Sequence, residues 1–484
     1  MGRSIKQQSI DRRRRRQVMP NKYSGQSDRP SDYPSTLEEM NDRFIYTEQG
    51  GRPTIYDTVD RRFMRTETFK SHLSNINVIT ANGPRPIGAQ WLKWPMRTSY
   101  RGGVVFAPGR TPAGKFNLWE GLSVEPAKGS CKLFLNHLRE IICGGDEASY
   151  NYLLDHFAWG LQNLEKKQQV AIVMRGKEGA GKGTVIDWLE AIYGAQHTIR
   201  LSSPEHVAGR FSDHLARVNL LFFDEAFWAG KVSLTGRLKT IITEGRMSSE
   251  GKGKDVEMID TFFRTFIASN EEWAVPAAIG SRRFTVFDVA STMIGNKAYF
   301  DAIAEERRNG GAAALLHMLQ RRDLSNFNER LPISTAALHH QVLHGLPTQK
   351  TYLLEVLINM EFHAKPERLE SKSKGMDITT KEFHSDYLQW FADNRVYGSS
   401  ATSRQFGKML ADIGVLRVGK KDRAHVRRLP PLPEFRELFA AHVTKGTATW
   451  DDLVTGWDPS TDPTTSDKVI PFDKAAKDQK GKMT

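Results

Sequence analysis

Short apolar runs separated by helical patterns characterise the middle of the chain, from residue 169 to residue 322. Four of these runs are mostly apolar, as expected for strands that are buried on both faces of a parallel sheet. They alternate with segments whose apolar residues recur at helical spacing, so the pattern predicts an α/β domain with a mostly parallel sheet. The predicted strands are 170–174, 218–223, 263–268 and 284–289.

Different patterns flank this domain. Apolar residues from Lys132 to Lys166 recur at helical spacing with a break at Gly144 and Gly145, which predicts a helical hairpin. Ahead of it, strand-like and helical pieces mix, and we expect the tryptophans there to form a core rather than to stack on bases. The predicted domains are a small α+β domain at 36–131, the hairpin at 132–168, the α/β domain at 169–322, a helical linker at 323–375 and a winged-helix-like domain at 376–445.

The winged-helix prediction rests on the order of elements after residue 375. Two helical segments, 381–393 and 403–413, are followed by a strand at 415–418 and then by a turn rich in cations. The cations of this turn are Lys420, Lys421, Arg423, Arg427 and Arg428.

The composition favours a polyanionic partner. Lys and Arg total 69 against 56 Asp and Glu, which gives a formal net charge of +13 and attracts phosphates. The terminal segments 1–35 and 446–484 are polar and predict disorder, because they bury too little apolar surface to offset the entropy of ordering. The arginine run at 12–16 is interpreted either as a solvated charge run or as a phosphate contact.

Cysteine usage and hydropathy exclude other classes of protein. Cys131 and Cys143 are too few for a disulfide framework or a thiolate metal site, and the histidines show no metal-binding spacing. No run approaches the roughly 18 apolar residues of a membrane span. We therefore expect a cytoplasmic protein without a structural metal or a membrane partner.

The strongest chemical signal is a glycine-rich loop between the first predicted strand and a helix. Such a loop turns backbone N–H groups towards phosphates, and the helix N-terminus and the lysine add positive charge. We therefore expect this loop to bind ATP and Mg²⁺. The alternative interpretation is an ordinary glycine-rich turn. The position after Lys182 usually carries Ser or Thr but is Gly183, so the hydroxyl nearest to Mg²⁺ is expected on Thr184. The nucleotide-binding residues are Gly176, Gly179, Ala180, Gly181, Lys182, Gly183 and Thr184.

Two acids follow the second predicted strand. Asp224 is expected to help hold Mg²⁺, and Glu225 to orient the attacking water or accept its proton. The alternative is a solvated helix start. Because parallel strands end at one edge of a sheet, Asn270 after the third strand is expected to reach the same site as a sensor of the phosphate, although an ordinary turn residue is the simpler interpretation.

Two further groups of cations have a functional and a structural interpretation. Arg282 and Arg283 precede the fourth strand, where one of them is expected to act as an arginine finger, with Arg283 preferred, or to form a structural ion pair. Lys252 and Lys254 alternate with glycines, as in a hairpin tip that contacts a DNA backbone, although a flexible solvated loop fits the composition equally well.

In combination, GKEGAGKGT, LLFFDEAFWAG, LKTIITEG, FIASNEEWAVPA and SRRF resemble the motifs of superfamily 3 helicases of the AAA+ class, more closely the helicase portion of phage and poxvirus primase-helicases. The resemblance covers roughly residues 90–290. It implies a P-loop AAA+ core and a hexameric homo-oligomer that binds ATP between subunits, takes the arginine finger from a neighbour and draws single-stranded DNA through its pore from 3′ to 5′. The implied residues are Lys182 and Thr184 in the loop, Asp224 and Glu225 as the acids, Asn270 as the sensor, Arg283 as the finger, and Lys252 or Lys254 in the pore.

The sequence leaves two other functions open. The GAGKGT string also occurs in nucleoside monophosphate kinases, although these need no acid that activates water. An origin-binding or scaffold protein whose ATP site controls only assembly is the non-enzymatic alternative. Fewer than about 100 folded residues precede the resembling region, which is too few for a polymerase-type domain, so a separate primase or polymerase is an expected partner.

Overall fold

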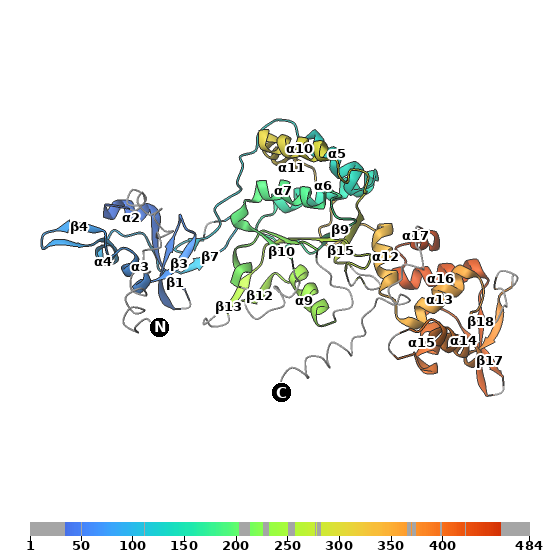
Figure 1. Cartoon of the computed structure of the whole chain (residues 1–484). Coiled ribbons are helices and arrows are strands. Elements are labelled where there is room, and N and C mark those ends of the chain that lie inside the picture. The colour runs from blue at the N-terminus through green and yellow to red at the C-terminus, as the bar shows by residue number, and fades with distance from the viewer. Residues whose placement is uncertain are drawn as a thin grey trace, which may run out of the picture. The chain divides into compact units, whose positions relative to one another are not determined.

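The computed structural model describes residues 34–49, 51–110, 112–202, 213–225, 232–249, 257–275, 277, 282–364, 369, 374–396, 399–421 and 423–455. The chain divides into an N-terminal unit, residues 1–105 with 111–118, and a main unit, residues 106–110 with 119–484 (Figure 1). The arginine run at 12–16 and most of the tail predicted from residue 446 lie outside the described residues. No helix in the described ranges is long and apolar enough to cross a membrane.

In its described residues, the N-terminal unit combines a small sheet, in the order β3-β2-β1-β6, with the short helices α2, α3 and α4. Trp91 is fully buried among Phe44 and Phe69, which confirms that it is a core residue, and its Nε1 donates to Asn41 Oδ1 (2.9 Å). The elements are α2 (Leu37–Arg43), β1 (Phe44–Gln49), β2 (Arg52–Asp57), β3 (Arg62–Arg65), α3 (Thr66–His72), β4 (Asn77–Thr80), β5 (Gly83–Pro86), α4 (Ile87–Lys93), β6 (Ser99–Tyr100), β7 (Val104–Val105) and β8 (Phe116–Asn117).

The main unit is a mixed α/β structure built around a parallel sheet. Its first elements are α5 (Lys132–Asn136), the π-helix η1 (His137–Ile142), α6 (Glu147–Gln162), β9 (Ala171–Arg175), α7 (Lys182–Tyr193), η2 (Ala195–His197), β10 (Thr198–Leu201), η3 (Asp213–Arg217), β11 (Leu220–Phe223) and α9 (Val232–Thr243). The elements that follow are β12 (Arg246–Ser249), β13 (Glu257–Asp260), β14 (Arg264–Ser269), β15 (Phe284–Asp288), α10 (Lys297–Glu306), η4 (Arg307–Gly311) and α11 (Ala312–Leu319).

The parallel sheet has five strands in the order β10-β11-β14-β9-β15. Successive side chains of a strand point to opposite faces, and both faces here are apolar: Ile172 and Met174 belong to one buried cluster, Ala171 and Val173 to the other. Double-sided burial explains why four strands are recognisable as mostly apolar runs. The sequence pattern misses the fifth strand, β10, because it is short and only partly buried.

Helices cover both faces of the sheet. The predicted helical hairpin forms as α5, η1 and α6, and it packs with α7, α10 and α11 on one face, whereas α9 lies on the other (Figure 1). Asp146 caps α6 by accepting the N–H of Ser149 (2.9 Å), and the break before it falls at Gly144 and Gly145, both with positive φ. The helices cover the two faces of the sheet, so the loops that follow the strands lie at its carboxyl edge.

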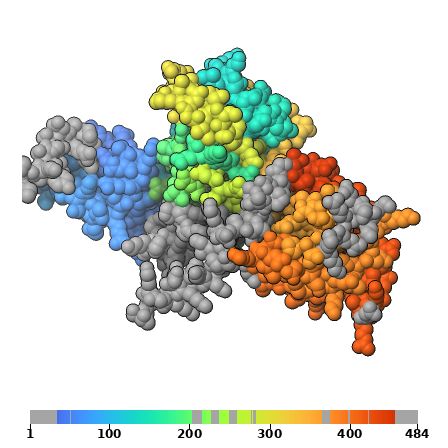
Figure 2. Space-filling model, turned by 45° about the vertical axis from the view of Figure 1, so that its right-hand side comes forward, coloured from blue at the N-terminus to red at the C-terminus, as the bar shows by residue number. Residues whose placement is uncertain are grey.

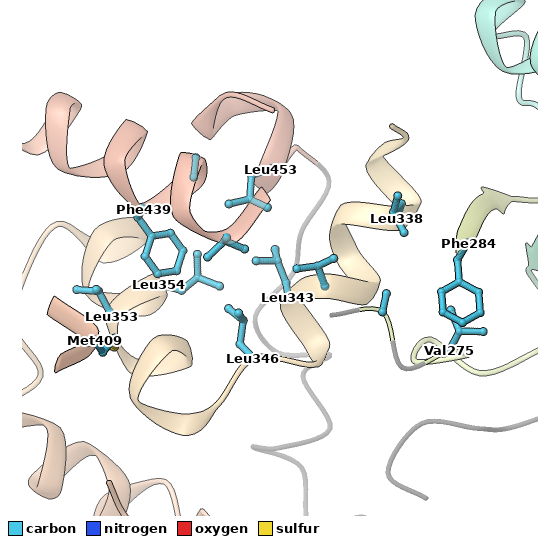
Figure 3. Close-up of a cluster of buried hydrophobic side chains, with 14 of the residues drawn as sticks. Val275, Phe284, Leu338, Leu343, Leu346, Leu353, Leu354, Met409, Phe439 and Leu453 are labelled. Carbon is cyan, nitrogen blue, oxygen red and sulfur yellow. The ribbon is translucent and has the colours of Figure 1, made fainter. Parts of the chain in front are cut away.

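The remaining elements form the C-terminal helical region, residues 336–455. They are α12 (Ala336–His344), α13 (Thr348–Asn359), β16 (Met376–Thr379), α14 (Thr380–Asp393), α15 (Ser403–Ile413), β17 (Arg417–Lys421), β18 (Ala424–Leu429), α16 (Leu432–Thr444) and α17 (Trp450–Val454). Helix α12 joins this region to the sheet: Leu338 lies towards Phe284 of β15, and Leu343 lies towards Phe439 and Leu453 of the C-terminal helices (Figure 3). One apolar core therefore runs from the sheet into the region.

Two helices and an antiparallel sheet in the order β16-β18-β17 occupy the segment predicted as winged-helix-like. The predicted strand and cation-rich turn are wrong in detail. Lys420 and Lys421 lie in β17, and Arg427 and Arg428 lie in β18, so only Arg423 of the five cations lies between the strands. In an exposed hairpin, the strands pair through backbone hydrogen bonds, so polar residues of low strand propensity can occupy them.

Part of the predicted disordered tail is also ordered. Helix α17 follows a capping box in which Thr449 and Asp452 satisfy each other's backbone amides, and Trp450 and Leu453 are buried. Two apolar residues three positions apart are too few to give a clear helical pattern, which is why sequence reasoning missed the helix.

Arg264 supplies our first prediction. This fully buried residue at the start of β14 closes the end of α6, because its Nη2 donates to the carbonyl oxygens of Gly160 and Asn163 (2.6 Å each) and its Nη1 to Asn219 Oδ1 (2.9 Å). In Arg264→Met, buried acceptors lose their donors, so we expect the free energy of unfolding to fall by about 3 kcal/mol. Urea denaturation measures this change.

The matched control is Arg321→Met, which removes an exposed arginine from the same unit and should change stability by less than about 0.5 kcal/mol. Equal effects of the two substitutions would contradict the capping role of Arg264.

Candidate functional site

The loop between β9 and α7 depends on its glycines. Gly179 and Gly181 have φ angles of 77° and 99°, which other residues rarely adopt. A Cβ atom on Gly181 would lie 2.5 Å from His137 Cε1, and one on Gly176 would lie 2.9 Å from the Val289 carbonyl oxygen. The loop is therefore tightly enclosed and turns directly into the first turn of α7, where the amides and the positive end of the helix dipole suit an anion.

Position 183 differs from its neighbours in the loop. Gly183 is exposed, and a Cβ atom added there meets nothing within 4 Å, so space does not require glycine. Thr184 is half-buried, and its N–H donates to the Gly181 carbonyl oxygen (3.1 Å). Its hydroxyl is the first one after Lys182 in the helix.

Lys182 lies at the centre of the site. Its ammonium group donates to the carbonyl oxygens of Gly176 and Lys177, the latter at 2.9 Å, and to Asn270 Oδ1 at 2.8 Å. Burial lowers the pKa of Lys182, while the carboxylates of Asp224 and Glu225 act in the opposite direction. Both acids are thus close enough to act electrostatically on this lysine, from a strand that is not adjacent to β9.

The acids occupy an exposed position at the carboxyl end of β11. The Asp224 N–H donates to the Leu201 carbonyl oxygen (2.8 Å), which fixes the backbone where the strand ends. Glu225 has a φ of 55°, in the left-handed region that costs a non-glycine residue about 1 kcal/mol or more. Strain of this kind gathers at functional sites, where the surrounding structure holds a side chain in one direction.

Asn270 joins the two parts of the site. It follows β14, the strand between β11 and β9, and its side chain accepts from Lys182. The carbonyl oxygen of the preceding residue, Ser269, accepts the N–H of Gly176 (3.1 Å), so the end of β14 is tied to the start of the loop. The structure thus brings the predicted sensor to the predicted loop across 88 residues of sequence.

His137 also contacts the loop, which sequence reasoning missed because it treated every histidine as an ordinary one. One ring nitrogen, Nε2, lies 3.1 Å from the Gly181 carbonyl oxygen, and Nδ1 lies 3.1 Å from the Tyr299 hydroxyl. Burial lowers the pKa of His137, which favours the neutral ring. Its partners lie in distant parts of the chain, so no local signal marks it.

Gln341 of α12 holds the loop that follows Asn270. Its side-chain oxygen accepts the N–H groups of Ala274 (2.8 Å) and Val275 (3.1 Å), and its amide nitrogen donates to the Glu272 carbonyl oxygen. Gln341 is fully buried. The C-terminal helical region therefore contacts the loop after Asn270 directly. No spacing in the sequence indicates this contact.

Arg283 does not join this group. Its carbonyl oxygen accepts the N–H of Ala171, the first residue of β9, so it lies at the amino edge of the sheet, opposite to the edge that carries Lys182. Arg282 beside it is exposed. Lys252 and Lys254 lie outside the described residues, but the strands that flank them, β12 and β13, pair antiparallel as a hairpin requires.

The residues at the carboxyl edge of the sheet fit a nucleoside triphosphate with Mg²⁺. The loop offers amides and a buried ammonium group for phosphate oxygens, and Thr184 and Asp224 offer oxygens of the kind that Mg²⁺ prefers alongside water and phosphate. Within the described ranges, no three His, Cys, Asp or Glu side chains are grouped as they would be to hold a metal by themselves.

Comparison with known proteins gives one family match and a likeness in fold. A family model described as a family of unknown function (DUF5906) matches residues 174–283, from the loop strand to Arg283. No curated protein matches the chain. The chain shares its fold with the C-terminal region of NrS-1.

Two solved structures establish this likeness. The apo structure of the NrS-1 C-terminal region (305–718) has a TM-score of 0.60 at 15% sequence identity, and the alignment covers 80% of this chain and 95% of that one. The A form of the same region has a TM-score of 0.58 at 15% identity, with 80% and 96% covered. At this identity the likeness concerns the fold alone.

Proposed function

We propose that the chain is an ATP-driven DNA helicase of bacteriophage replication that works as a hexameric ring on single-stranded DNA. The observation that carries the proposal is the meeting of Lys182, Asn270 and the two acids at one edge of the sheet. Strand β14 lies between the strand of the loop and the strand of the acids, which fits the sensor role implied by the resemblance to superfamily 3 helicases.

Each side chain has a defined task in this proposal. Lys182 and the loop amides hold the phosphates, and Thr184 and Asp224 hold Mg²⁺, which when bound neutralises phosphate charge. Glu225 accepts a proton from the attacking water, and Asn270 orients the terminal phosphate and that water. Lys182 already donates to Asn270, so a phosphate oxygen placed between them would contact both residues.

In a ring, the predicted residues that do not reach this site would act on a neighbouring subunit or on DNA. Arg283 lies at the amino edge of its own sheet and would serve as the finger of the neighbouring subunit, where it stabilises the charge of the transition state. Lys252 and Lys254, which lie between β12 and β13 in sequence, would contact the DNA strand in the pore. A separate primase or polymerase would use the opened strands.

The test measures ATP hydrolysis and strand separation by the purified full-length chain. We expect single-stranded DNA to stimulate hydrolysis and a forked duplex to be opened from a 3′ tail, with a mass corresponding to six subunits in the presence of ATP and DNA. Phosphate transfer to AMP without release of free phosphate would instead identify a nucleoside monophosphate kinase. ATP binding without hydrolysis would identify a scaffold.

A further inference from the structure

The β17–β18 hairpin carries a group of exposed cations that the proposed ATPase does not use. The hairpin extends from the helices of its region and stands out at the lower right of the surface view (Figures 1 and 2). All residues of β17 are exposed, including Arg417, Lys420 and Lys421, and Arg423 at the turn is exposed as well. Among the described residues, none of these four has a carboxylate within ion-pair distance.

The placement of these cations lowers the stability of the hairpin. Arg417 lies opposite Arg427, and like charges directly across a strand pair are destabilising. The positive charge of Arg417 is the largest cause of a lowered pKa at His425. A structural role for the hairpin would not require this repulsion, whereas a bound polyanion would relieve it.

The two arginines of β18 are used differently. Arg427 is buried and donates to the carbonyl oxygens of Val415 (2.6 Å) and Gly407 (2.5 Å), which fixes the hairpin against α15. Arg428 pairs with Asp377 of the neighbouring strand. The hairpin is thus a rigidly anchored support, and its exposed cations lie on β17 and at the turn.

Helix α15 extends the same surface. Arg404 and Lys408 are exposed and lie one turn apart, on the stripe of the helix that also includes Gly407, where Arg427 of the hairpin makes contact. The helix is fixed at both ends, by a capping box at Thr402 and by Gly414 in the left-handed conformation. The helix and the hairpin that Arg427 fixes against it therefore both present exposed cations.

We propose that the β17–β18 hairpin and the exposed stripe of α15 bind the phosphate backbone of double-stranded DNA. Sequence-independent duplex binding uses cations on phosphates, which this surface supplies. Single-strand binding uses exposed aromatic rings for stacking, and every aromatic side chain described between residues 374 and 455 is buried or half-buried. The site is separate from the proposed pore contacts and does not depend on ATP hydrolysis.

The test compares two double variants of the full chain with the same change in charge. Lys420→Glu/Lys421→Glu alters the hairpin, and Lys128→Glu/Lys132→Glu alters two exposed lysines near α5. Fluorescence anisotropy measures the affinity for a blunt-ended duplex and for a single strand of equal length, over a range of salt concentrations. The thermal midpoint and the basal ATPase rate should be the same in both variants as in the wild type.

We expect the hairpin variant to bind the duplex at least about ten-fold more weakly and with a salt dependence that is shallower by about 2 in logarithmic slope, since two phosphate contacts are lost. The control variant should stay within about two-fold of the wild type, because salt screens distant charges. Unchanged duplex affinity in the hairpin variant, an equal loss in both variants or an equal loss for the single strand would each overturn the proposal. These readouts remain valid if the chain proves to hydrolyse no ATP.

Discussion

Replacing Lys182 with alanine is expected to lower the rate of ATP hydrolysis by about a thousand-fold, since a preorganised charge at a developing anion contributes on this scale. The ammonium group is buried at the start of α7 and is held by two loop carbonyl oxygens and Asn270. Water cannot replace it there without losing the positive charge that the phosphates need. Release of inorganic phosphate under saturating ATP measures the effect.

The matched control is Lys177→Ala in the same loop. The Lys177 side chain is exposed, and only its backbone carbonyl oxygen contacts Lys182. Its removal should change the rate by less than about three-fold, as exposed charges contribute little. If Lys182→Ala kept a tenth or more of the activity, the role of the loop lysine would be wrong.

Replacing Glu225 with glutamine is expected to lower hydrolysis by about a thousand-fold while ATP still binds, because general bases contribute roughly 10² to 10⁴ in rate. The substitution keeps the shape of the side chain, and with it the strained backbone at a φ of 55°. A glutamine cannot accept the proton of the attacking water. Nucleotide retained on the protein and phosphate released from it are measured in the same sample.

Glu178→Gln provides the comparison for Glu225. Glu178 is an exposed glutamate of the loop that also acts electrostatically on Lys182, so the two variants lose the same charge near the same lysine. Only Glu225→Gln should abolish turnover. Similar modest losses in both would mean that the acids merely tune the charge around Lys182 and that neither activates water.

Much of the main unit follows from its apolar pattern. Strands buried on both faces leave continuous apolar runs, so the sequence predicted four of the five parallel strands and the positions of Lys182 and Asn270 at their ends. The edge strand β10 was missed because it is buried only in part. Helix α17 was missed because its burial depends on contacts with distant helices rather than on a local period.

The parts of the site that sequence reasoning missed are contacts between distant segments. His137 reaches Gly181 across 44 residues, and Gln341 reaches the loop after Asn270 across more than 60. A buried glutamine or histidine looks the same in sequence whether it supports a loop or fills a core. The sequence places the cations of the β17–β18 hairpin in a turn, because Lys, Arg and Gly rarely dominate a strand.

The most direct test of the account is a structure of the chain with Mg²⁺ and a non-hydrolysable ATP analogue. We expect the β- and γ-phosphates against the loop amides and Lys182, with Asn270 and the carboxylates of Asp224 and Glu225 directed at the γ-phosphate. A nucleotide bound elsewhere, or acids turned away from its γ-phosphate towards solvent, would contradict it.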